Sequence, residues 1–376
     1  MAAESTPTPL VGILAAEIRS RGRITFAEYM ETCLYHSQHG YYSTHADESR
    51  RDYITSVDVT PIFGRLLAVQ FQQTWDLMGR PRSFTLVEGG AGSGELAKQI
   101  LTAASDSGAE FYSALHYVAI ERSAARRAAQ IQNLQREVAS GRFSSLVDLP
   151  ARPFEGCVFS NELLDAFPVH RVVQEGGKLR EIYVGLGGKG LCEETGPPSS
   201  NAITEYFDRQ RITLRESQQA EVNLAACNWI GEVASRLRRG FILTIDYGHQ
   251  AKELYDERHQ QGTLLAYSNH RVSEDFYRAP GKQDVTAHVN FTALDLSAER
   301  SGLTPCGYTS QTNFFLALAR HNNFAALEDS AATENQKTAA RRTFNTLIHP
   351  EGMGTFGVAL HHKGMDGVRL AGFEPL

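Results

Sequence analysis

The chain has 376 residues, which is enough for one large α/β domain with additions or for two domains. Its composition, 42% apolar and 21% charged residues, is typical of a globular protein. The formal net charge is −6, from 37 basic and 43 acidic residues, and no long basic block occurs. Non-specific binding to nucleic acid is therefore not expected.

The first 82 residues are predicted to form a mostly helical N-terminal region. Apolar residues recur at helical spacing between positions 10 and 18. Thr25 and Glu28 have the spacing of a capping box, which predicts that a helix begins directly after Thr25. A further helix is predicted to begin at Pro61, because proline favours the first position of a helix.

From residue 84 onward, apolar strand-like runs alternate with helical patterns. Such alternation indicates βαβ units and a parallel sheet, with ligands beyond the carboxyl ends of the strands. We therefore predict an α/β fold with a Rossmann-like sheet and helices on both faces. The predicted strands lie within residues 84–88, 115–121, 156–164, 239–248 and 355–363.

Residues 83–376 are predicted to form this α/β domain, with insertions at about 170–200 and 311–348. The first insertion contains two strand-like runs on either side of Gly176 and Gly177. A glycine pair between two such runs is typical of a β-hairpin turn.

A glycine-rich turn, with the pattern E-x-G-x-G-x-G, follows the first predicted strand. Glu88 ends the strand, and Gly90, Gly92 and Gly94 lead into the next helix. Glycines permit positive φ and close approach of a ligand, and the free N–H groups of the following helix favour an anionic or polar group there. This turn is predicted to hold a nucleoside-type ligand.

The pattern does not fit the two common phosphate-binding motifs. A dinucleotide fingerprint starting at Gly90 requires glycine at position 95, where this chain has Glu95. A P-loop requires Lys-Ser or Lys-Thr after the glycines, and neither pair is present. Without a pyrophosphate to bind, Glu88 can instead accept hydrogen bonds from ammonium or hydroxyl groups.

The glycine pattern resembles motif I of the class I S-adenosylmethionine-dependent methyltransferases. In that fold an acid at the end of the second strand holds both ribose hydroxyls, and Glu121 occupies this position here. A carboxylate can accept two hydroxyl hydrogen bonds at once. The alternative for Glu121 is a solvated loop acid.

Six ordered blocks extend the resemblance over nearly the whole chain, and together they are similar to the MidA-like family. This family includes the mitochondrial complex I assembly methyltransferase. The five blocks besides the glycine motif are RDYITSVDVTPIFGRLL, SNELLDAFPVHR, LTIDYGH, APGKQDVTAHVNF and HPEGMGTFGVAL. The resemblance implies S-adenosyl-L-methionine as cofactor and methylation of an arginine on a partner protein, a complex I subunit in the mitochondrial member.

The resemblance also implies roles for individual residues. Glu88, Gly90 and Gly92 would hold the methionine part of the cofactor, with Gly94 completing the motif. Glu121 would hold its ribose. Tyr53, Thr55 and Ser56 would close over the cofactor. Asn161, Glu162 and Asp165 would line the site of methyl transfer. Four residues would lie near the acceptor: Asp246, Asp284, Thr286 and His288.

Glu162 and Asp165 have a chemical reason to face an arginine. Arginine stays protonated in water, and carboxylates can orient its guanidinium through paired hydrogen bonds. Residues three apart share a face if they lie on a helical turn, which we expect for this pair. The alternatives are that one of them caps the following helix or pairs with Arg171.

Histidines enter the prediction in two ways. His288 is a candidate for removing a proton after methyl transfer, and the alternative is a packed or exposed histidine. His361 and His362 are adjacent on a predicted strand, so their side chains point to opposite faces and make poor joint metal ligands. The five cysteines are scattered without a CxxC pair. We predict no metal and no disulfide framework.

Three other functions stay open from the residues alone. They are a methyltransferase that acts on a small molecule, a non-catalytic assembly factor that binds the cofactor, and an NAD-linked oxidoreductase, which Glu95 opposes. Glu4 and Glu17 argue against an organellar presequence, and no apolar run reaches the ~20 residues that span a bilayer. A cytoplasmic protein without membrane insertion is expected.

Overall fold

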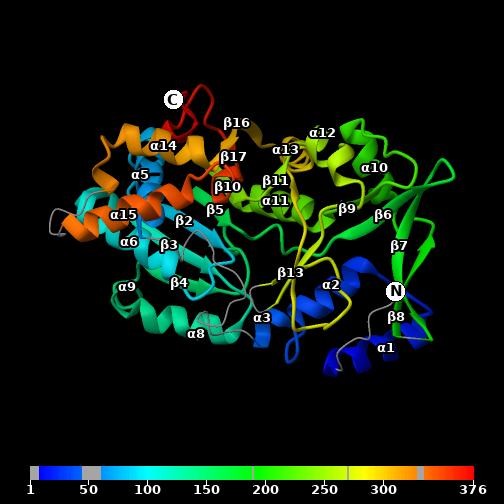
Figure 1. Cartoon of the computed structure of the whole chain (residues 1–376). Coiled ribbons are helices and arrows are strands. Elements are labelled where there is room, and N and C mark those ends of the chain that lie inside the picture. The colour runs from blue at the N-terminus through cyan, green and yellow to red at the C-terminus, as the bar shows by residue number, and fades with distance from the viewer. Residues whose placement is uncertain (1–7, 45–60, 189, 269–270, 328–333) are drawn as a thin grey trace. The chain divides into compact units, whose positions relative to one another are not determined.

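A computed structural model describes residues 8–44, 61–188, 190–268, 271–327 and 334–376 of the chain (Figure 1). These residues fall into two compact units. Unit 1 comprises Met1–Tyr53, Leu164–Trp229 and Gly248–Ser297, and unit 2 comprises Ile54–Leu163, Ile230–Tyr247 and Ala298–Leu376. This division differs from the boundary expected between residues 82 and 83, because helix α5 (Ile62–Leu77) packs into the core of unit 2.

Unit 2 is built on a seven-stranded sheet of order β16-β17-β10-β5-β2-β3-β4. The strands β10, β5, β2, β3 and β4 are parallel to their neighbours in this series, whereas β17 runs antiparallel to both β10 and β16. The strand bounds are β2 (Phe84–Gly89), β3 (Leu115–Ile120), β4 (Phe143–Leu146), β5 (Phe154–Asn161), β10 (Leu237–Asp246), β16 (Thr304–Ser310) and β17 (Gly357–Lys363).

This sheet confirms the predicted α/β fold. Each of the five predicted strand segments contains or overlaps one of its strands. The chain runs from β2 to β3 and β4 on one side, then returns to β5 and β10 on the other side. In open parallel sheets, ligands bind at such a reversal of strand order, outside the carboxyl ends of the strands. A ligand site is therefore expected at the carboxyl ends of β2 and β5.

Helices cover the sheet of unit 2. Residues of α5, α6, α14 and α15 form one apolar cluster with Leu86, Phe159 and Leu243 of the sheet, and Figure 1 shows these helices on one side of it. Alternate strand residues such as Val87 and Val158 point to the opposite face and are also buried. The remaining helix bounds are α6 (Glu95–Ser107), α7 (Ala109–Ala114), α8 (Ala124–Asn133), α9 (Gln135–Ala139), α14 (Gln311–His321) and α15 (Glu334–Leu347), with short 3-10 turns η3 (Ala325–Leu327), η4 (Met353–Thr355) and η5 (Ala371–Phe373).

Unit 1 contains an antiparallel sheet of order β1-β7-β6-β9, in which β8 also pairs with β7. The predicted hairpin is confirmed: Glu175 of β6 pairs with Lys178 of β7, and Gly176 and Gly177 form the turn with φ of +59° and +73°. The strand bounds are β1 (Ile24–Thr25), β6 (His170–Glu175), β7 (Lys178–Gly187), β8 (Gly190–Gly196) and β9 (Gln219–Val222).

The N-terminal helices pack in unit 1, and the predicted capping box is confirmed. The Glu28 N–H donates to Thr25 Oγ1 at 3.2 Å, and the Thr25 N–H donates to Glu28 Oε2 at 2.8 Å. Apolar side chains of α1 and α2 share a buried cluster with Val184 and Val285. The helix bounds are α1 (Pro9–Arg21), α2 (Phe26–Tyr35), α3 (Tyr41–Thr44), α10 (Asn201–Gln210), α11 (Leu224–Arg236), α12 (Ala251–Leu254), η2 (Glu257–His259) and α13 (Phe291–Arg300), of which α11 and α13 extend into unit 2.

Two small sheets complete unit 1. One is the parallel pair β11 (Gly248–His249) and β15 (Val289–Asn290), and the other has the order β13-β12-β14, with β12 (Leu265–Ser268), β13 (Arg271–Ser273) and β14 (Asp284–Thr286). The pairing of β11 with β15 brings Gly248 and His249 next to Val289 and Asn290.

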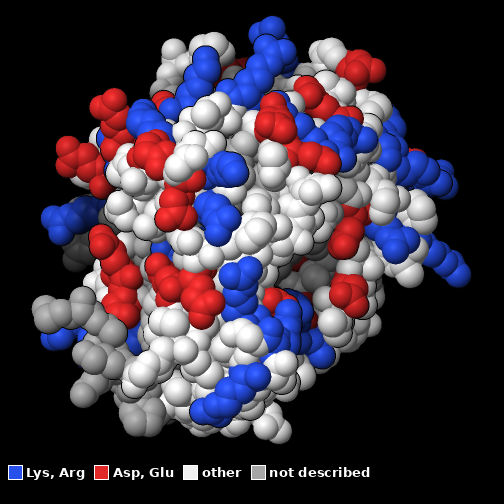
Figure 2. Space-filling model, turned by 90° about the vertical axis from the view of Figure 1, so that its right-hand side faces the viewer, with Lys and Arg blue, Asp and Glu red and all other residues white. Residues whose placement is uncertain are grey.

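The charged surface agrees with the composition. Figure 2 shows acidic and basic side chains interspersed over the face that it presents. Among the described residues, none of the helices has the length and apolar character required to cross a bilayer.

Candidate active site

The glycine-rich segment forms the connection from β2 to α6, as predicted. Gly90, Gly92 and Gly94 have φ of +70°, +53° and +84°, which residues other than glycine rarely adopt. A Cβ on Gly90 would also lie 2.8 Å from Leu163 Cδ1, and a Cβ on Gly94 would lie 3.1 Å from Gln130 Cγ. The loop therefore needs glycine for its backbone conformation and for its close packing.

Glu88, the last residue but one of β2, is a buried carboxylate with 4% of its surface exposed. The Tyr117 hydroxyl of β3 donates to Glu88 Oε2 at 2.6 Å. Burial, together with the neighbouring Glu88 charge, raises the pKa of Tyr117 well above its usual value, so the phenol keeps its proton and remains a donor. Tyr117 thus donates a hydrogen bond that holds the Glu88 side chain beside the glycine loop.

Glu121 follows β3 and is tied to the glycine loop. The Gly92 N–H donates to Glu121 Oε2 at 3.1 Å, and the Ser123 N–H donates to Oε1 at 2.8 Å. Arg126 Nη1 lies 4.0 Å from the same Oε2, and both side chains are almost fully buried. The interpretation of Glu121 as a solvated loop acid is wrong, because the carboxylate is held against the loop with 7% of its surface exposed.

Gln130 of α8 holds the other side of the same loop, and it was not predicted from the sequence. Its amide Nε2 donates to the Gly92 carbonyl at 2.7 Å, and its Oε1 accepts from Ser145 of β4. Gln130 is fully buried. The backbone N–H and the carbonyl of Gly92 are therefore both hydrogen-bonded to buried side chains, which fixes the loop without a bound molecule.

Asn161 and Glu162 lie at the carboxyl end of β5, beside the loop end of β2, since Gly89 pairs with Ser160. Glu162 has φ of +50°, its N–H donates to the Ile245 carbonyl at 3.0 Å, and its Oε1 accepts from Asn161 Nδ2 at 3.1 Å. Positive φ costs energy in a residue with a side chain and clusters at functional sites.

This geometry corrects the expectation for Glu162 and Asp165. The two residues were expected to share one face of a helical turn, but Glu162 has a left-handed backbone and no helix follows it. The hydrogen bond from the Glu162 N–H to the Ile245 carbonyl continues the β5–β10 pairing and prevents the helical turn. Neither residue caps a following helix.

Asp246 lies at the carboxyl end of β10 and is fully buried. Its Oδ2 accepts from the Leu163 N–H at 3.2 Å, and its Oδ1 accepts from the Tyr247 N–H at 3.0 Å. These contacts hold the segment that carries Glu162. The geometry thus gives Asp246 a positioning contact in addition to its predicted place near the acceptor.

Comparison with known proteins shows the family to which this chain belongs. Residues 66–309, which are more than half of the chain, match the model of a family described as "Putative S-adenosyl-L-methionine-dependent methyltransferase". The chain belongs to this family. It is a methyltransferase that uses S-adenosyl-L-methionine, as the E-x-G-x-G-x-G pattern predicted.

Curated relatives resemble the chain over almost its full length. A Drosophila melanogaster protein named "Protein arginine methyltransferase NDUFAF7 homolog, mitochondrial" is 29% identical, and the match covers 94% of this chain and 84% of the relative. The Homo sapiens protein named "Protein arginine methyltransferase NDUFAF7, mitochondrial" is 26% identical over 98% of this chain and 87% of its own length. The predicted resemblance to the mitochondrial methyltransferases is confirmed.

Two solved structures from Burkholderia thailandensis also match the whole chain. One is bound to S-adenosyl-homocysteine; it is 32% identical, with a TM-score of 0.85 over 99% of this chain and 98% of that chain. The other is a native structure with 32% identity and a TM-score of 0.84 over the same shares of both chains. This methyltransferase therefore shares its fold with a protein that binds S-adenosyl-homocysteine, the demethylated form of the cofactor.

The residues at the loop suit S-adenosyl-L-methionine chemically. The buried carboxylate of Glu121 accepts two backbone N–H bonds and retains lone-pair sites for hydroxyl groups, since a carboxylate has about four. The N-terminus of α6, which begins at Glu95 directly after Gly94, offers N–H groups that favour a carboxylate such as that of methionine. The assignment of individual atoms of the cofactor to these residues stays a prediction.

Four further predicted residues, Asp165, Asp284, Thr286 and His288, belong to unit 1. Asp165, Asp284 and Thr286 are buried, the Asp165 carbonyl accepts from the Ala287 N–H at 3.0 Å, and Asp284 Oδ1 accepts from the Tyr42 hydroxyl at 2.9 Å. Arg171, considered above as a partner of Glu162 or Asp165, instead forms an ion pair with Glu193. The backbone of Asp165 thus contacts the segment 284–288, which contains Asp284. Glu162 belongs to unit 2.

His288 lies among two other histidines, His249 and His259. Burial, together with these neighbouring rings, lowers the pKa of His288 to about 4, which makes it a weak base at neutral pH. Its predicted role in removing a proton stays a prediction. Tyr53, Thr55 and Ser56, which were predicted to close over the cofactor, lie outside the described residues.

Proposed function

We propose that this methyltransferase transfers the methyl group of S-adenosyl-L-methionine to an arginine side chain of a partner protein. The observation that carries the proposal is the conformation of Glu162. Its carboxylate lies at the carboxyl end of β5, on a backbone with positive φ, and hydrogen-bonded by its neighbour Asn161. The residue is only partly buried, so its side chain can be reached by a substrate.

A carboxylate in this place suits a cationic acceptor. A guanidinium group presents several N–H donors in one plane, and carboxylates bind it through paired, charge-assisted hydrogen bonds. Glu162 would orient one nitrogen of the acceptor and balance its charge, while Asn161 holds the carboxylate and Asp246 holds the following segment. Asp165, Asp284, Thr286 and His288 enter the proposal through the family resemblance.

The cofactor would be held by the glycine loop and the two carboxylates beside it. We assign Glu88, Gly90 and Gly92 to its methionine part, with Gly94 at the start of α6, and Glu121 to its ribose hydroxyls. When bound, S-adenosyl-L-methionine supplies a methyl group on a positively charged sulfur. The protein then has to align the acceptor and exclude water, and it needs no covalent nucleophile of its own.

The relatives support a protein acceptor. Those of Drosophila melanogaster and Homo sapiens are named protein arginine methyltransferases, and they match this chain over most of its length. We extend this acceptor class to the present chain, with a respiratory complex I subunit as the first candidate partner and the cytoplasm as the expected location.

Methylation of peptide libraries tests the proposal. The full chain is incubated with S-adenosyl-L-methionine labelled in its methyl group and with three libraries that differ only in a central arginine, lysine or glutamine. We expect label in the arginine library alone, and mass spectrometry of the product locates the modified residue. Label on lysine, or on small-molecule acceptors instead of any peptide, would contradict an arginine acceptor.

A chain that binds S-adenosyl-homocysteine but labels none of the libraries would point to the non-catalytic alternative, an assembly factor that keeps the cofactor site. Candidate partner proteins are then tested in the same assay as intact substrates. If the intact complex I subunit also stays unlabelled, catalysis on arginine is ruled out for that partner.

A further inference from the structure

Three histidines that are far apart in the sequence converge in unit 1. His249, His259 and His288, called here the histidine cluster, each offer one ring nitrogen, and these three nitrogens all lie within 4.8 Å of one another. The ring centroids are 5.5 Å apart for His249 and His259, 5.4 Å for His249 and His288, and 6.0 Å for His259 and His288. All three side chains are partly exposed, so an ion can reach them.

The backbone around the histidine cluster holds two of its members side by side. His249 ends β11 and His288 directly precedes β15, and these strands pair with Gly248 opposite Val289. A Cβ on Gly248 would lie 2.1 Å from the Val289 carbonyl oxygen, so glycine is needed for this approach. The His288 N–H donates to Thr263 Oγ1 at 3.0 Å, which fixes its backbone.

His259 is positioned by the chain that follows β11. It ends the short 3-10 helix η2, whose N-cap residue Asp256 accepts from the Arg258 N–H. The His259 N–H donates to the Asp256 carbonyl at 3.3 Å, and the Gly262 N–H donates to the His259 carbonyl at 3.2 Å. The third ring of the histidine cluster thus comes from an ordered turn.

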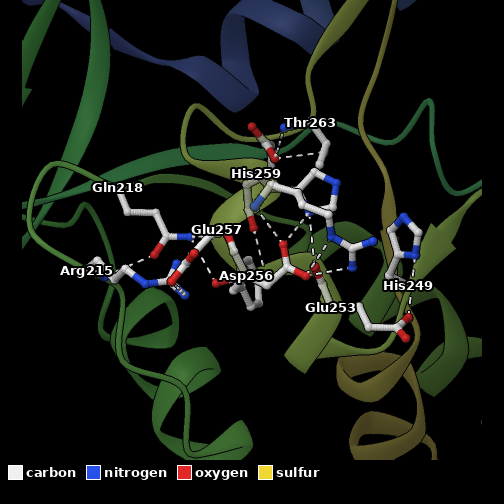
Figure 3. A network of polar contacts seen from close by, with 11 residues as sticks. Arg215, Gln218, His249, Glu253, Asp256, Glu257, His259 and Thr263 are labelled. Carbon is white, nitrogen blue, oxygen red and sulfur yellow. Dashed lines mark hydrogen bonds and ion pairs between the residues drawn. The ribbon is translucent and has the colours of Figure 1, made fainter.

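Oxygen atoms lie beside the Nδ1 atoms of two of the three rings. Figure 3 shows His249 and His259 with Glu253 and Asp256 beside them. The Nδ1 of His259 lies 3.0 Å from the Glu253 carbonyl oxygen, and the Nδ1 of His249 lies 3.7 Å from Glu253 Oε2. The carbonyl oxygen beside His259 Nδ1 favours a proton there and leaves the lone pair on Nε2, whereas the 3.7 Å separation at His249 is longer than a hydrogen bond. Metal-binding histidines commonly have this arrangement, with the second nitrogen facing a carboxylate or a backbone carbonyl.

The electrostatic surroundings suit a cation. Glu253 and Asp256 lie near the rings: Glu253 Oε2 is 3.7 Å from His249 Nδ1, and Asp256 Oδ1 is 3.9 Å from His259 Nδ1, while the Arg258 side chain donates to Asp256 Oδ2. A neutral imidazole is the form that binds a metal ion.

We propose that the histidine cluster binds one zinc ion through His249, His259 and His288, with the fourth position open to water. Zinc suits three imidazole nitrogens in tetrahedral geometry, at about 2.0–2.1 Å each, and sites with three protein ligands keep an open position. Tetrahedral binding needs nitrogens about 3.4 Å apart, so small rotations of the partly exposed rings would close the site.

A bound ion would connect three segments of unit 1 that share no continuous secondary structure. It would tie β11, η2 and the segment before β15 at one point. Because the site belongs to the folded state, the metal would stabilise this unit by mass action. No metal was expected from the sequence, because the three histidines lack the short spacings of known zinc motifs.

Zinc titration of the full chain tests this proposal. The chain is prepared without a histidine tag, freed of metal with a chelator and titrated with zinc in competition with a chromophoric chelator. We expect one ion per chain and a rise in Tm on zinc addition. Cobalt substituted for zinc should give the visible absorption of a four-coordinate ion.

Single variants assign the ion to the histidine cluster. His249→Ala, His259→Ala and His288→Ala should each weaken zinc binding by more than about tenfold. The control His321→Ala removes an exposed histidine at the end of α14 and should bind zinc like the unchanged chain. Circular dichroism without metal checks that each variant folds, and the three variants are judged together so that one misfolded protein does not decide the result.

Two results would overturn the proposal. The first is a chain that takes up no zinc and gives no cobalt spectrum. The second is zinc uptake that is the same in the three cluster variants and in His321→Ala, which would show adventitious binding elsewhere. Binding of S-adenosyl-homocysteine is measured on the same samples, so a failure of the metal site is separable from a failure of the methyltransferase site.

Discussion

The two units assemble their polar sites in different ways. In unit 2, the glycine loop, Glu88 and Glu121 lie within one βαβ unit, and the loop backbone itself bonds the Glu121 carboxylate. In unit 1, the histidine cluster comes from three segments that meet through the pairing of β11 and β15. A site made from contiguous residues can be recognised in the sequence, whereas a site made by long-range pairing requires the structure.

Buried charges also differ between the units. Glu88 of unit 2 accepts from Tyr117 beside a glycine loop whose conformation suits a ligand. In unit 1, the fully buried carboxylate of Glu181 lies 2.8 Å from the ring of His170 and accepts from the Ser199 N–H, and none of these three is a predicted site residue. We therefore expect changes near the loop to alter ligand binding or turnover, and changes at Glu181 to alter stability alone.

The largest effect is expected for Glu162→Gln. Removal of the charge that would orient the acceptor should lower methyl transfer about 10- to 100-fold, the loss expected for a charge-assisted hydrogen bond. The affinity for S-adenosyl-homocysteine should change little. Steady-state labelling of the arginine library measures the first quantity and calorimetry the second. Glu155→Gln, at the opposite end of β5, is the matched control and should keep full turnover. Unchanged turnover in Glu162→Gln would remove the basis for an arginine acceptor at this position.

Glu121→Gln should reduce cofactor affinity. The variant loses a charged acceptor that we assign to the ribose hydroxyls, so binding of S-adenosyl-homocysteine should weaken about 10- to 100-fold. Glu110→Gln, on the same unit with a side chain that is 80% exposed, should bind normally in calorimetry. Equal affinities for the two variants would argue that Glu121 only supports the loop.

Glu181→Gln should lower the stability of the fold and leave cofactor binding unchanged. Although burial alone would raise the pKa of Glu181, hydrogen bonds from His170 and Ser199 lower it below the ordinary 4.5. Its carboxylate therefore stabilises the fold above about pH 4.5, and this contribution is lost as pH falls through the folded-state value. We expect a loss of about 1–3 kcal/mol at pH 7.

Thermal unfolding from pH 7 to pH 3 checks the sign of this effect. The Tm difference between the unchanged chain and Glu181→Gln should be largest near neutral pH and should narrow below about pH 4.5. Glu205→Gln removes an exposed carboxylate that pairs with Arg209 and should cost no more than about 0.5 kcal/mol. A difference that grows toward acid pH would contradict the lowered pKa.

The smallest effect is expected for Tyr117→Phe. The variant leaves Glu88 with one donor fewer, and the hydrogen bond contributes about 0.5–1.5 kcal/mol, which is a few-fold change in affinity for S-adenosyl-homocysteine. Tyr183→Phe removes a comparable hydroxyl bond, to the Pro197 carbonyl, in unit 1. Both should lower Tm slightly, but calorimetry should detect weaker ligand binding for Tyr117→Phe only.

The sequence was most informative where a local rule determines the structure. The capping box of Thr25 and Glu28, the turn at Gly176 and Gly177, and the glycine loop after β2 each follow from residues a few positions apart, and each is confirmed. The alternating pattern likewise predicted most of the parallel strands but missed the short parallel strand β4. The short antiparallel strand β9 was also missed, because so few residues carry no clear periodicity.

Where long-range contacts decide, the sequence was insufficient. Glu162 was expected on a helical turn, but pairing of its N–H with Ile245 of β10 imposes a positive φ. The role of Tyr117 depends on the register of β2 and β3, which puts Ala119 opposite Glu88 and Tyr117 two residues earlier on the same face. These facts depend on strand pairing, which neither spacing nor composition reveals.

Calorimetric titration of Gly92→Ala with S-adenosyl-homocysteine tests most directly that the glycine loop holds the cofactor. The control is Gly141→Ala, which places the same side chain on a positive φ of +72° in the same unit, at a position where a Cβ meets nothing within 4 Å. We expect the unchanged chain and Gly141→Ala to bind alike, and Gly92→Ala to bind at least about tenfold more weakly, a loss of about 1.4 kcal/mol. Equal binding by Gly92→Ala and the unchanged chain would contradict a cofactor site at this loop.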